Sequence, residues 1–499
     1  MTRTIIWCFI CGLFPVAGML AQKADTRPSK GGNGSLTEQK LQDPLQVDPR
    51  TINELCAVNA RRSPGIKEFG PQSSLNAKRF WLVGLTNDKL IEWHVKAPAF
   101  GSYEVDFLIN CKPGTQIKLA GATGNVVFTA TEQGWQRAKA KSPFSLPGGE
   151  SVVRLSVVNA KDTIDIKSVE LINLAEKKSL EKRIQAFKGD AEWMKDAGYG
   201  IMTQVGGWAY PSKGDKKPWP GFAENFDVKA FVDKMRDMGA SYIVWSATWS
   251  DYLFPAPIKA IEEVLPARVS KRDLIGELIK ECRKYNIRVM LYYHLGHDHK
   301  EVLLAKGWKD SPHEEYRSRQ VWLEREMKIF TEMGNRYGTG LDAIFLDDGC
   351  VWYPADFEKL GAALKAGNPK RLICYNPWIG PNITPFQDFY CGEGFDGQQT
   401  KYKISDGTIT EGPQKGLQLF GNFIFDGPDW GINKPGVTIQ PPNNWTTDKL
   451  VAMTQRLQKE RYSVAINLLV YEDGTIGEQS YQLLKEAAIK LKRGKWAVK

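Results

Sequence analysis

Beyond its first 22 residues the sequence has no CxxC pair and no second long apolar run. Without CxxC pairs a structural zinc site is not expected. A membrane helix needs about 20 consecutive apolar residues, and only the N-terminal run 5–21 approaches that length. No nucleic-acid recognition motif is present, and the basic residues are spread along the chain. We therefore expect a soluble protein without a membrane span, a structural zinc or a nucleic-acid partner.

The N-terminal run has the three parts of a secretory signal peptide. Arg3 supplies a positive charge, an apolar stretch follows, and small residues precede Gln22. Residues 1–22 are therefore predicted to be a cleaved signal peptide, which predicts a secreted or periplasmic protein. Six of the eight cysteines remain after cleavage, but a chain of this size does not need disulfides as a framework.

The composition is that of a globular protein of two or three domains. The chain has 499 residues, of which 42% are hydrophobic and 25% charged. Sixteen tryptophans are present, which indicates either flat rings for sugar stacking or a tryptophan-rich core. The net charge of +10 favours an acidic substrate, such as a sulfated or uronic polysaccharide, or reflects only a lysine-rich solvated surface.

The first half of the chain divides into a lead-in segment, residues 23–70, and a β-sandwich, residues 71–178. In the second segment short alternating runs are separated by turns such as Pro113-Gly114, which is typical of an antiparallel sandwich. Residues 98–105, the pair Gly134-Trp135 and the turn Gly148-Gly149 resemble carbohydrate-binding modules of families 6 and 35. The resemblance implies either sugar binding or a structural role beside an enzyme.

Residues 179–499 alternate between strand and helix patterns. Eight strand candidates with helical crossovers predict a (β/α)₈ barrel, and thus an α/β fold behind the all-β domain. The predicted strands are Tyr199–Val205, Ser241–Ser246, Arg288–His294, Asp342–Asp347, Arg371–Asn376, Phe389–Glu393, Leu417–Phe425 and Tyr462–Val470.

The active site of such a barrel lies at the carboxyl ends of its strands. Two carboxylates, Asp347 on strand four and Glu393 on strand six, come from those ends. Glycoside hydrolysis needs one carboxylate to attack the anomeric carbon and another to protonate the leaving oxygen; structural carboxylates at strand ends are the alternative. The other strand ends supply Gln204, Thr248, Trp249, Asp251, His294, Asn376, Asp426 and Asn467, and the loops supply Trp208 and Trp430.

The barrel resembles the family 29 α-L-fucosidases in collinear order over about residues 200–490. Residues 342–349 match the family's nucleophile strand, and residues 388–393 resemble the segment that ends in its acid/base. Further likeness lies in residues 429–433 and 465–469. The resemblance implies that Asp347 is the nucleophile and Glu393 the acid/base of a retaining mechanism that needs neither a metal nor another cofactor.

The sequence departs from that family where the sugar is held. The family binds fucose with a histidine ending strand one and a histidine pair ending strand two, whereas Gln204 and Trp249-Ser250 stand here. Only Asp251 of the second cluster remains, so we expect altered sugar specificity. The predicted substrate-binding residues are Gln204, Trp208, Trp249, Asp251, His294, Asn376 and Trp430.

Two residue assignments have rivals. Asp348 competes with Asp347, but adjacent side chains on a strand face opposite ways and the motif register favours Asp347. The spacing of His294, His297 and His299 could suit a metal, although the family needs none. A histidine acid/base, as in the distantly related family 107 endo-fucanases, competes with Glu393.

Three functions follow from these patterns. The first is a secreted retaining glycoside hydrolase, α-L-fucosidase-like with altered specificity, acting on an oligo- or polysaccharide. The second is an endo-acting, fucanase-like hydrolase of a sulfated polysaccharide. The third is a non-catalytic carbohydrate-binding protein on a decayed barrel. The lost histidines favour the third, and the retained pair Asp347 and Glu393 argues against it.

Overall fold

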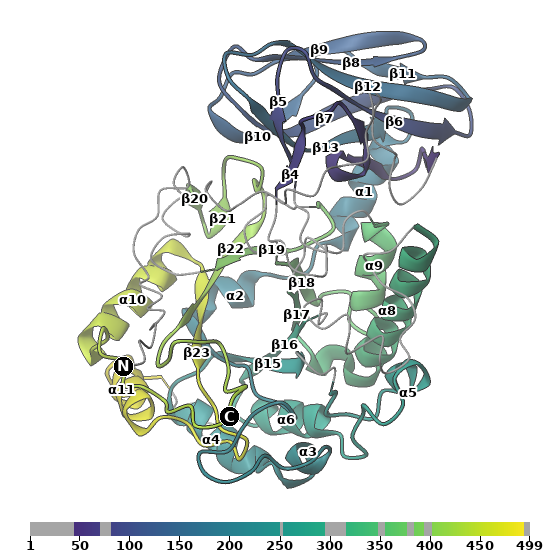
Figure 1. The fold of residues 1–499 in the computed structure, drawn as a ribbon. Helices are drawn as coiled ribbons and strands as arrows, with labels where there is room; N and C mark the ends of the chain where they lie inside the picture. Colours follow the sequence, from purple (N-terminus) through teal and green to yellow (C-terminus); the bar gives the residue numbers. More distant parts are fainter. Residues whose placement is uncertain are drawn as a thin grey trace, which may run out of the picture.

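The structure is a computed structural model that describes residues 44–69, 81–249, 253–294, 316–347, 355–376, 384–393 and 402–493. The predicted signal peptide lies outside these residues. A β-sandwich and a larger α/β region lie one above the other (Figure 1). Within the described ranges, no helix is both long and apolar enough to cross a membrane.

The sandwich consists of two sheets whose facing side chains form one apolar core, in which Trp93, Val105 and Leu155 are fully buried. Four short strands come from residues 45–69, inside the segment predicted as a lead-in. The first sheet contains β1 (Leu45–Gln46), β6 (Leu90–Ala97), β12 (Gly149–Asn159), β8 (Gln116–Gly121), β9 (Gly124–Thr129) and β3 (Arg61–Arg62). The second contains β10 (Gly134–Lys139), β7 (Gly101–Cys111), β13 (Ile164–Asn173), β5 (Trp81–Leu85), β4 (Lys67–Phe69), β11 (Phe144–Leu146) and β2 (Ile52–Cys56).

The outer face of the second sheet packs on the α/β region. Cys56 and Trp81 are buried in the apolar cluster that also holds the helices and strands of that region, and Trp135 packs against it. An ion pair of 2.8 Å joins Lys177, on the first helix after the sandwich, to Glu104 of β7. The two parts are therefore in contact, and the sandwich does not stand apart on a linker.

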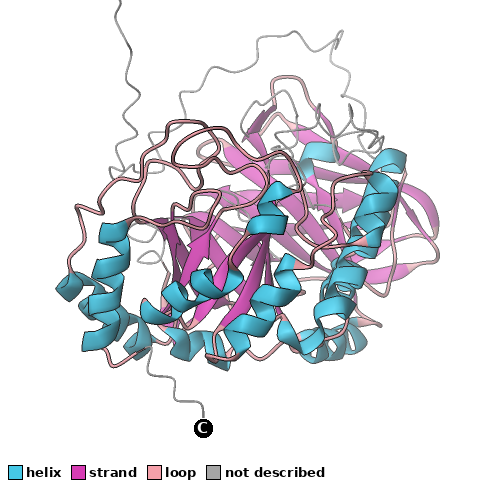
Figure 2. Cartoon of the chain, turned by 90° about the horizontal axis from the view of Figure 1, so that it is seen from below, coloured by secondary structure: helices cyan, strands magenta, loops and turns pink. Residues whose placement is uncertain are grey.

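All eight predicted strands of the α/β region are present, and they lie parallel in one curved sheet with helices outside it (Figure 2). The sheet runs without a break from β18 through β14 to β19, and a small hairpin, β20 and β21, extends it. Its strands are β18 (Leu372–Tyr375), β17 (Ala343–Leu346), β16 (Arg288–Tyr293), β15 (Tyr242–Thr248), β14 (Tyr199–Thr203), β23 (Ser463–Leu468), β22 (Gln418–Ile424), β19 (Phe389–Glu393), β20 (Ile404–Ser405) and β21 (Thr408–Ile409).

The helices begin where the sequence places capping residues. Asp227, Asp273 and Asp356 each accept a hydrogen bond from a backbone N–H in the first turn of the helix that follows. The helices are α1 (Lys177–Phe187), α2 (Glu192–Ala197), α3 (Gly221–Asn225), α4 (Val228–Asp237), α5 (Lys259–Val264), α6 (Leu274–Arg283), α8 (Tyr316–Tyr337), α9 (Phe357–Leu364), α10 (Thr447–Glu460) and α11 (Glu478–Lys490).

The (β/α)₈ prediction is confirmed in part, because the described residues form no ladder between β18 and β19. These two strands meet at Asp388, whose backbone N–H donates to the Ile373 carbonyl at 2.8 Å. The Asp388 carboxylate also accepts from the Ile373 N–H at 2.9 Å and pairs with the Lys365 ammonium at 2.9 Å. Both charged side chains are buried. The hydrogen bonds between Asp388 and Ile373 thus join the two edges in place of a strand ladder, and a buried ion pair fixes Asp388 to Lys365 at the end of α9.

Replacing Asp388 by Asn is expected to destabilise the protein by about 3–5 kcal/mol, because the Lys365 charge is left buried without its partner. The midpoint of urea unfolding measures this loss. The control is Asp448→Asn, which breaks an exposed ion pair with Lys490 and is expected to change the free energy of unfolding by less than about 1 kcal/mol. Equal effects of the two substitutions would contradict the role given to the buried pair.

Candidate active site

The strand ends bring a layer of polar side chains together above the apolar interior. The interior layer contains Met202, Tyr292, Phe345, Cys374, Cys391, Phe420 and Ala465, one from each of seven strands. Because successive strand residues alternate in direction, the residue two positions further along each strand lies on the same face. Those positions are Gln204, His294, Asp347, Asn376, Asn422 and Asn467, and Glu393 is the last backbone position of β19.

Asp347 is held by two side chains of neighbouring strands. The Tyr292 hydroxyl donates to its Oδ2 at 2.5 Å, and the Asn376 amide donates to its Oδ1 at 2.8 Å. Its backbone N–H donates to the Tyr293 carbonyl at 2.9 Å, which continues the strand ladder to this residue. Hydrogen bonds to a carboxylate are the stronger kind, so the orientation of this side chain is fixed.

Aromatic rings border Asp347 on the side of β15 and β16. The His294 ring stacks on Tyr292 with 6.2 Å between centroids, and Trp249 meets His294 edge-on at 6.4 Å. Trp208 meets Trp249 edge-on at 5.9 Å. Trp208 is only 2% exposed, whereas Trp249 is partly exposed. Trp249 therefore has ring surface to offer a sugar, and Trp208 supports it from behind.

Five buried polar atoms in this layer have no hydrogen-bond partner among the described residues. An unpartnered buried polar group costs about 1–3 kcal/mol, so a ring of them indicates a place for a polar ligand. Asn467 keeps one bond, from its amide to the Trp430 carbonyl at 2.9 Å, which ties the Trp430 loop to β23. The five atoms are Gln204 Oε1, Thr248 Oγ1, Asn376 Oδ1, Asn422 Oδ1 and Asn467 Oδ1.

Asn422 is absent from the predicted site. It lies on β22, in register with Glu393 of β19 on one side and Ala465 of β23 on the other. The strand pattern contained the signal, because Asn422 is two residues beyond the interior Phe420. The prediction instead took Asp426 as the polar residue at this strand end, because it follows the predicted strand Leu417–Phe425.

Several predicted residues lie outside the described part of the chain. Asp251, Asp348, His297 and His299 belong to undescribed segments, and Glu393 is described only as the last residue of β19. Within the described ranges, no group of three histidine, cysteine or acidic side chains could hold a metal ion.

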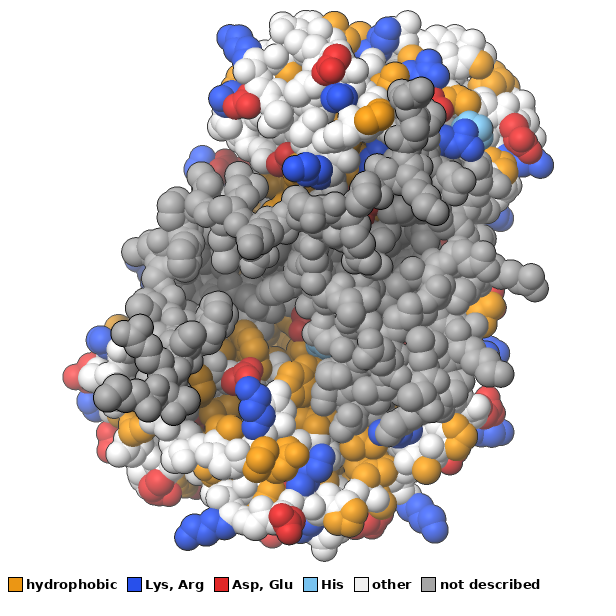
Figure 3. Space-filling view, in the orientation of Figure 1, with side chains coloured by type: hydrophobic (Ala, Val, Ile, Leu, Met, Phe, Trp, Pro, Cys, Tyr) orange, Lys and Arg blue, Asp and Glu red, His pale blue; other side chains and the backbone are white. Residues whose placement is uncertain are grey.

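The face of the molecule seen in Figure 1 has hydrophobic side chains gathered on its lower half, with Lys and Arg side chains among them (Figure 3).

Residues 180–399 match the alpha-L-fucosidase family model. This segment contains both Asp347 and Glu393, and the match confirms the resemblance found in the sequence. The match supports a glycoside hydrolase function for the α/β region.

Solved fucosidase structures resemble the chain at low identity. An alpha-L-fucosidase from Lactobacillus casei in complex with its alpha-L-fucose product is 18% identical, with a TM-score of 0.43 over 61% of this chain and 98% of that one. The Thermotoga maritima alpha-fucosidase with a mechanism-based inhibitor is 16% identical, with a TM-score of 0.42 over 62% and 75%. None of the curated proteins compared with the chain matches it.

Asp426 has a structural position in the α/β region. Its side chain is fully buried and accepts from the Leu469 N–H at 2.9 Å and the Ser480 hydroxyl at 2.7 Å. These bonds tie the end of β22 to β23 and to α11. Burial raises the pKa of the Asp426 carboxyl to about 6, since desolvation disfavours its charged form.

The pKa of Asp426 predicts how stability depends on pH. The folded protein holds this proton up to about pH 6, whereas an unfolded aspartate releases it near pH 4. Between these pH values unfolding therefore releases a proton, and the contribution of Asp426 to stability falls by about 2 kcal/mol as the pH rises from 4 to 6.

Urea unfolding of wild type and Asp426→Asn at several pH values checks this dependence. The Asn variant is expected to gain stability relative to wild type as the pH rises from 4 to 6. Asp473→Asn, an exposed carboxylate nearby in the sequence, is the control. A wild-type-to-variant difference that stays flat over this interval would contradict the assignment.

Proposed function

We propose that the protein is a retaining glycoside hydrolase, α-L-fucosidase-like with altered sugar specificity, which acts through a covalent glycosyl-enzyme. One observation carries the proposal. In a segment that matches the fucosidase family, Asp347 is oriented by Tyr292 and Asn376 inside a ring of buried, unsatisfied polar atoms. A carboxylate held in this way among polar groups is suited to attack a bound sugar.

In the proposed reaction a carboxylate oxygen of Asp347 attacks the anomeric carbon, the glycosidic bond breaks, and Glu393 gives its proton to the leaving oxygen. Glu393 then takes a proton from water, which attacks the same carbon, breaks the glycosyl ester and restores the configuration. Tyr292 and Asn376 hold the carboxylate in place before attack, so less orientational freedom is lost on the way to the transition state.

The altered specificity is proposed from the side chains that face the sugar position. Gln204 follows β14 and Trp249 follows β15, at positions where the family has imidazoles, and Thr248 is the last residue of β15. Amides and hydroxyls donate and accept hydrogen bonds without titrating near neutral pH, and Trp249 adds a ring face. A pocket of this kind rejects a sugar that leaves its buried polar groups unpaired.

Two further proposals concern the rest of the chain. We propose that residues 1–22 direct export, so that the enzyme works outside the cytoplasm on extracellular glycans. We also propose that the sandwich supports the α/β region or holds part of the glycan. Its packing on that region through Cys56, Trp81 and Trp135 favours the supporting role.

A substrate screen tests the proposed function. The mature protein is incubated with aryl α-L-fucosides, other aryl glycosides, and fucose-containing and sulfated polysaccharides, and the anomer released first is identified by NMR. Release with retained configuration is expected. Release of monosaccharide indicates exo action, and a ladder of oligosaccharides indicates the endo-acting alternative. An inverted product would contradict the mechanism, and binding without any release would favour a carbohydrate-binding protein.

A further inference from the structure

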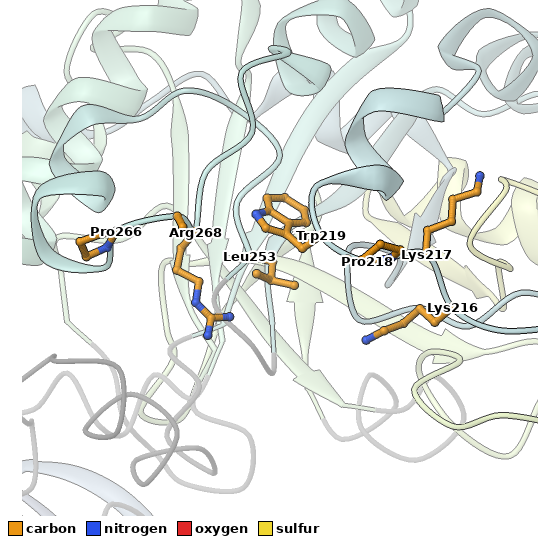
Figure 4. A pocket seen from close by; sticks show the side chains of 9 residues that line it. Lys216, Lys217, Pro218, Trp219, Leu253, Pro266 and Arg268 are labelled. Carbon is orange, nitrogen blue, oxygen red and sulfur yellow. The ribbon is translucent and has the colours of Figure 1, made fainter.

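A cationic pocket lies in the loops that follow β14 and β15, on the side of the sheet where the candidate active site lies. Its volume is about 550 Å³, and none of its nine described lining residues is acidic. Trp219 and Leu253 lie at its centre, and the basic residues are Lys216, Lys217 and Arg268 (Figure 4). A pocket with three cations in its lining is suited to a negatively charged ligand.

Backbone hydrogen bonds fix the walls of this pocket. The Phe254 N–H donates to the Arg268 carbonyl at 2.8 Å, which holds the two parts of the β15 loop together. The Lys217 N–H donates to the Glu472 carboxylate at 2.8 Å, which ties the β14 loop to the segment that follows β23. A Cβ at Gly207 would lie only 2.6 Å from the Trp219 ring, so these segments are closely packed. The pocket is therefore a preformed feature of the fold.

Two of the cations converge on the opening. Lys216 and Arg268 extend toward it from opposite sides, whereas Lys217 points away (Figure 4). Arg268 is only 8% exposed; Lys216 is partly exposed, with its Nζ 5.3 Å from the Tyr210 ring centre. The Trp219 indole N–H is buried and has no acceptor among the described residues. Two converging cations and an indole donor can together bind the oxygens of a sulfate or carboxylate.

The pocket lies on the same wall as the candidate nucleophile. Gly207 lines the pocket and precedes Trp208, which contacts Trp249. Trp249 contacts His294, whose ring stacks on the tyrosine that holds Asp347. Of these rings Trp249 is partly exposed and the others are buried behind it. Three successive ring contacts separate the pocket from Tyr292, so a glycan of several sugars that passes over Trp249 can reach both Asp347 and the basic residues.

We propose that this pocket is a subsite for an anionic substituent, a sulfate ester or a carboxylate, on a sugar further along the glycan that is cleaved at Asp347. This inference rests on the proposed function for its ligand being a glycan. It defines the substrate class as an anionic polysaccharide, for which a neutral fucoside would be only a partial mimic.

Calorimetric titration of the full-length Asp347→Asn variant tests the subsite without turnover. The probes are oligosaccharides of a sulfated fucan, the same material after desulfation, and oligosaccharides of a polyuronate. At least one anionic probe is expected to bind about tenfold more tightly than the desulfated one, which corresponds to one charge-assisted contact. Comparison of the two anionic probes distinguishes sulfate from carboxylate.

Added substitutions locate the contact. Lys216→Gln and Arg268→Gln are each expected to weaken binding of the preferred anionic probe about tenfold. Lys213→Gln is the matched control, because it removes the same charge from an exposed position in the same loop, and less than a twofold change is expected. If Arg268→Gln does not fold, Lys216→Gln decides.

Equal binding of all three probes, or equal losses for Lys213→Gln and Lys216→Gln, would overturn the subsite. The outcome is independent of hydrolysis. If wild type cleaves fucosides but the titrations show no charge preference, the subsite alone is wrong. If no glycoside is cleaved and the titrations give the expected pattern, the proposed function fails and the subsite stands.

Discussion

Replacing Asp347 by Asn is expected to lower kcat on every cleaved glycoside by on the order of 10³-fold or more, because the covalent step loses its nucleophile. The substitution is nearly isosteric, so the contacts with Tyr292 and Asn376 can still hold the side chain. Substrate binding is therefore expected to persist. Initial rates of wild type and variant, measured on the best substrate of the screen, check this expectation.

Two controls separate this effect from a general loss of structure. Asp473→Asn changes an exposed carboxylate that caps a turn through the Thr475 N–H, and its kcat is expected to remain within about twofold of wild type. Asp348→Asn tests the neighbouring rival. If Asp348→Asn is inactive while Asp347→Asn keeps its rate, the nucleophile has been assigned to the wrong residue.

Replacing Glu393 by Gln is expected to lower kcat by an amount that depends on the leaving group of the substrate. In a natural glycoside the leaving group is a sugar alkoxide, which is a poor leaving group unless it is protonated, so kcat is expected to fall by about 10²–10⁴-fold. In a nitrophenyl fucoside the nitrophenolate leaves without being protonated, so formation of the glycosyl-enzyme is expected to be affected far less. The intermediate then accumulates, because its hydrolysis still lacks the base, and a burst of nitrophenol is expected.

Stopped-flow measurement of the burst, with steady-state rates on both substrate types, tests the role of Glu393. Glu411→Gln is the control, because it changes an exposed carboxylate that pairs only with Lys403 among the described residues. Equal losses on the two substrate types would exclude Glu393 as the acid. The same leaving-group dependence in His294→Gln, but not in Glu393→Gln, would assign the proton to His294.

The strands and helices of the α/β region could be predicted because local signals determine them. Buried parallel strands are continuous apolar runs, and Asp227 and Asp273 mark helix starts by capping them. The short strands of residues 45–69 could not be predicted in this way. Arg61–Arg62 and Lys67–Phe69 are polar, and they are strands because β6 and β5 offer free edges to pair with. Local sequence does not encode such pairing.

The site was predictable to the extent that strand alternation determines it. Asp347, Asn376 and His294 continue the inward register of their strands. Asn422 was missed because the predicted strand ended at Phe425, beyond the last inward residue of β22. The structural position of Asp426 depends on Ser480 of α11, a tertiary contact between residues far apart in sequence. The burial of Trp208 behind Trp249 likewise depends on a tertiary contact that local sequence does not encode.

The most direct test of the central claim is to trap the intermediate. The protein is treated with a 2-deoxy-2-fluoro fucosyl fluoride, digested, and its peptides are sequenced by mass spectrometry. We predict one added fluorosugar on the peptide that contains Asp347, localised to that residue, and no such adduct in Asp347→Asn. An adduct on another carboxylate, or inactivation without any adduct, would contradict the claim that Asp347 forms the glycosyl-enzyme.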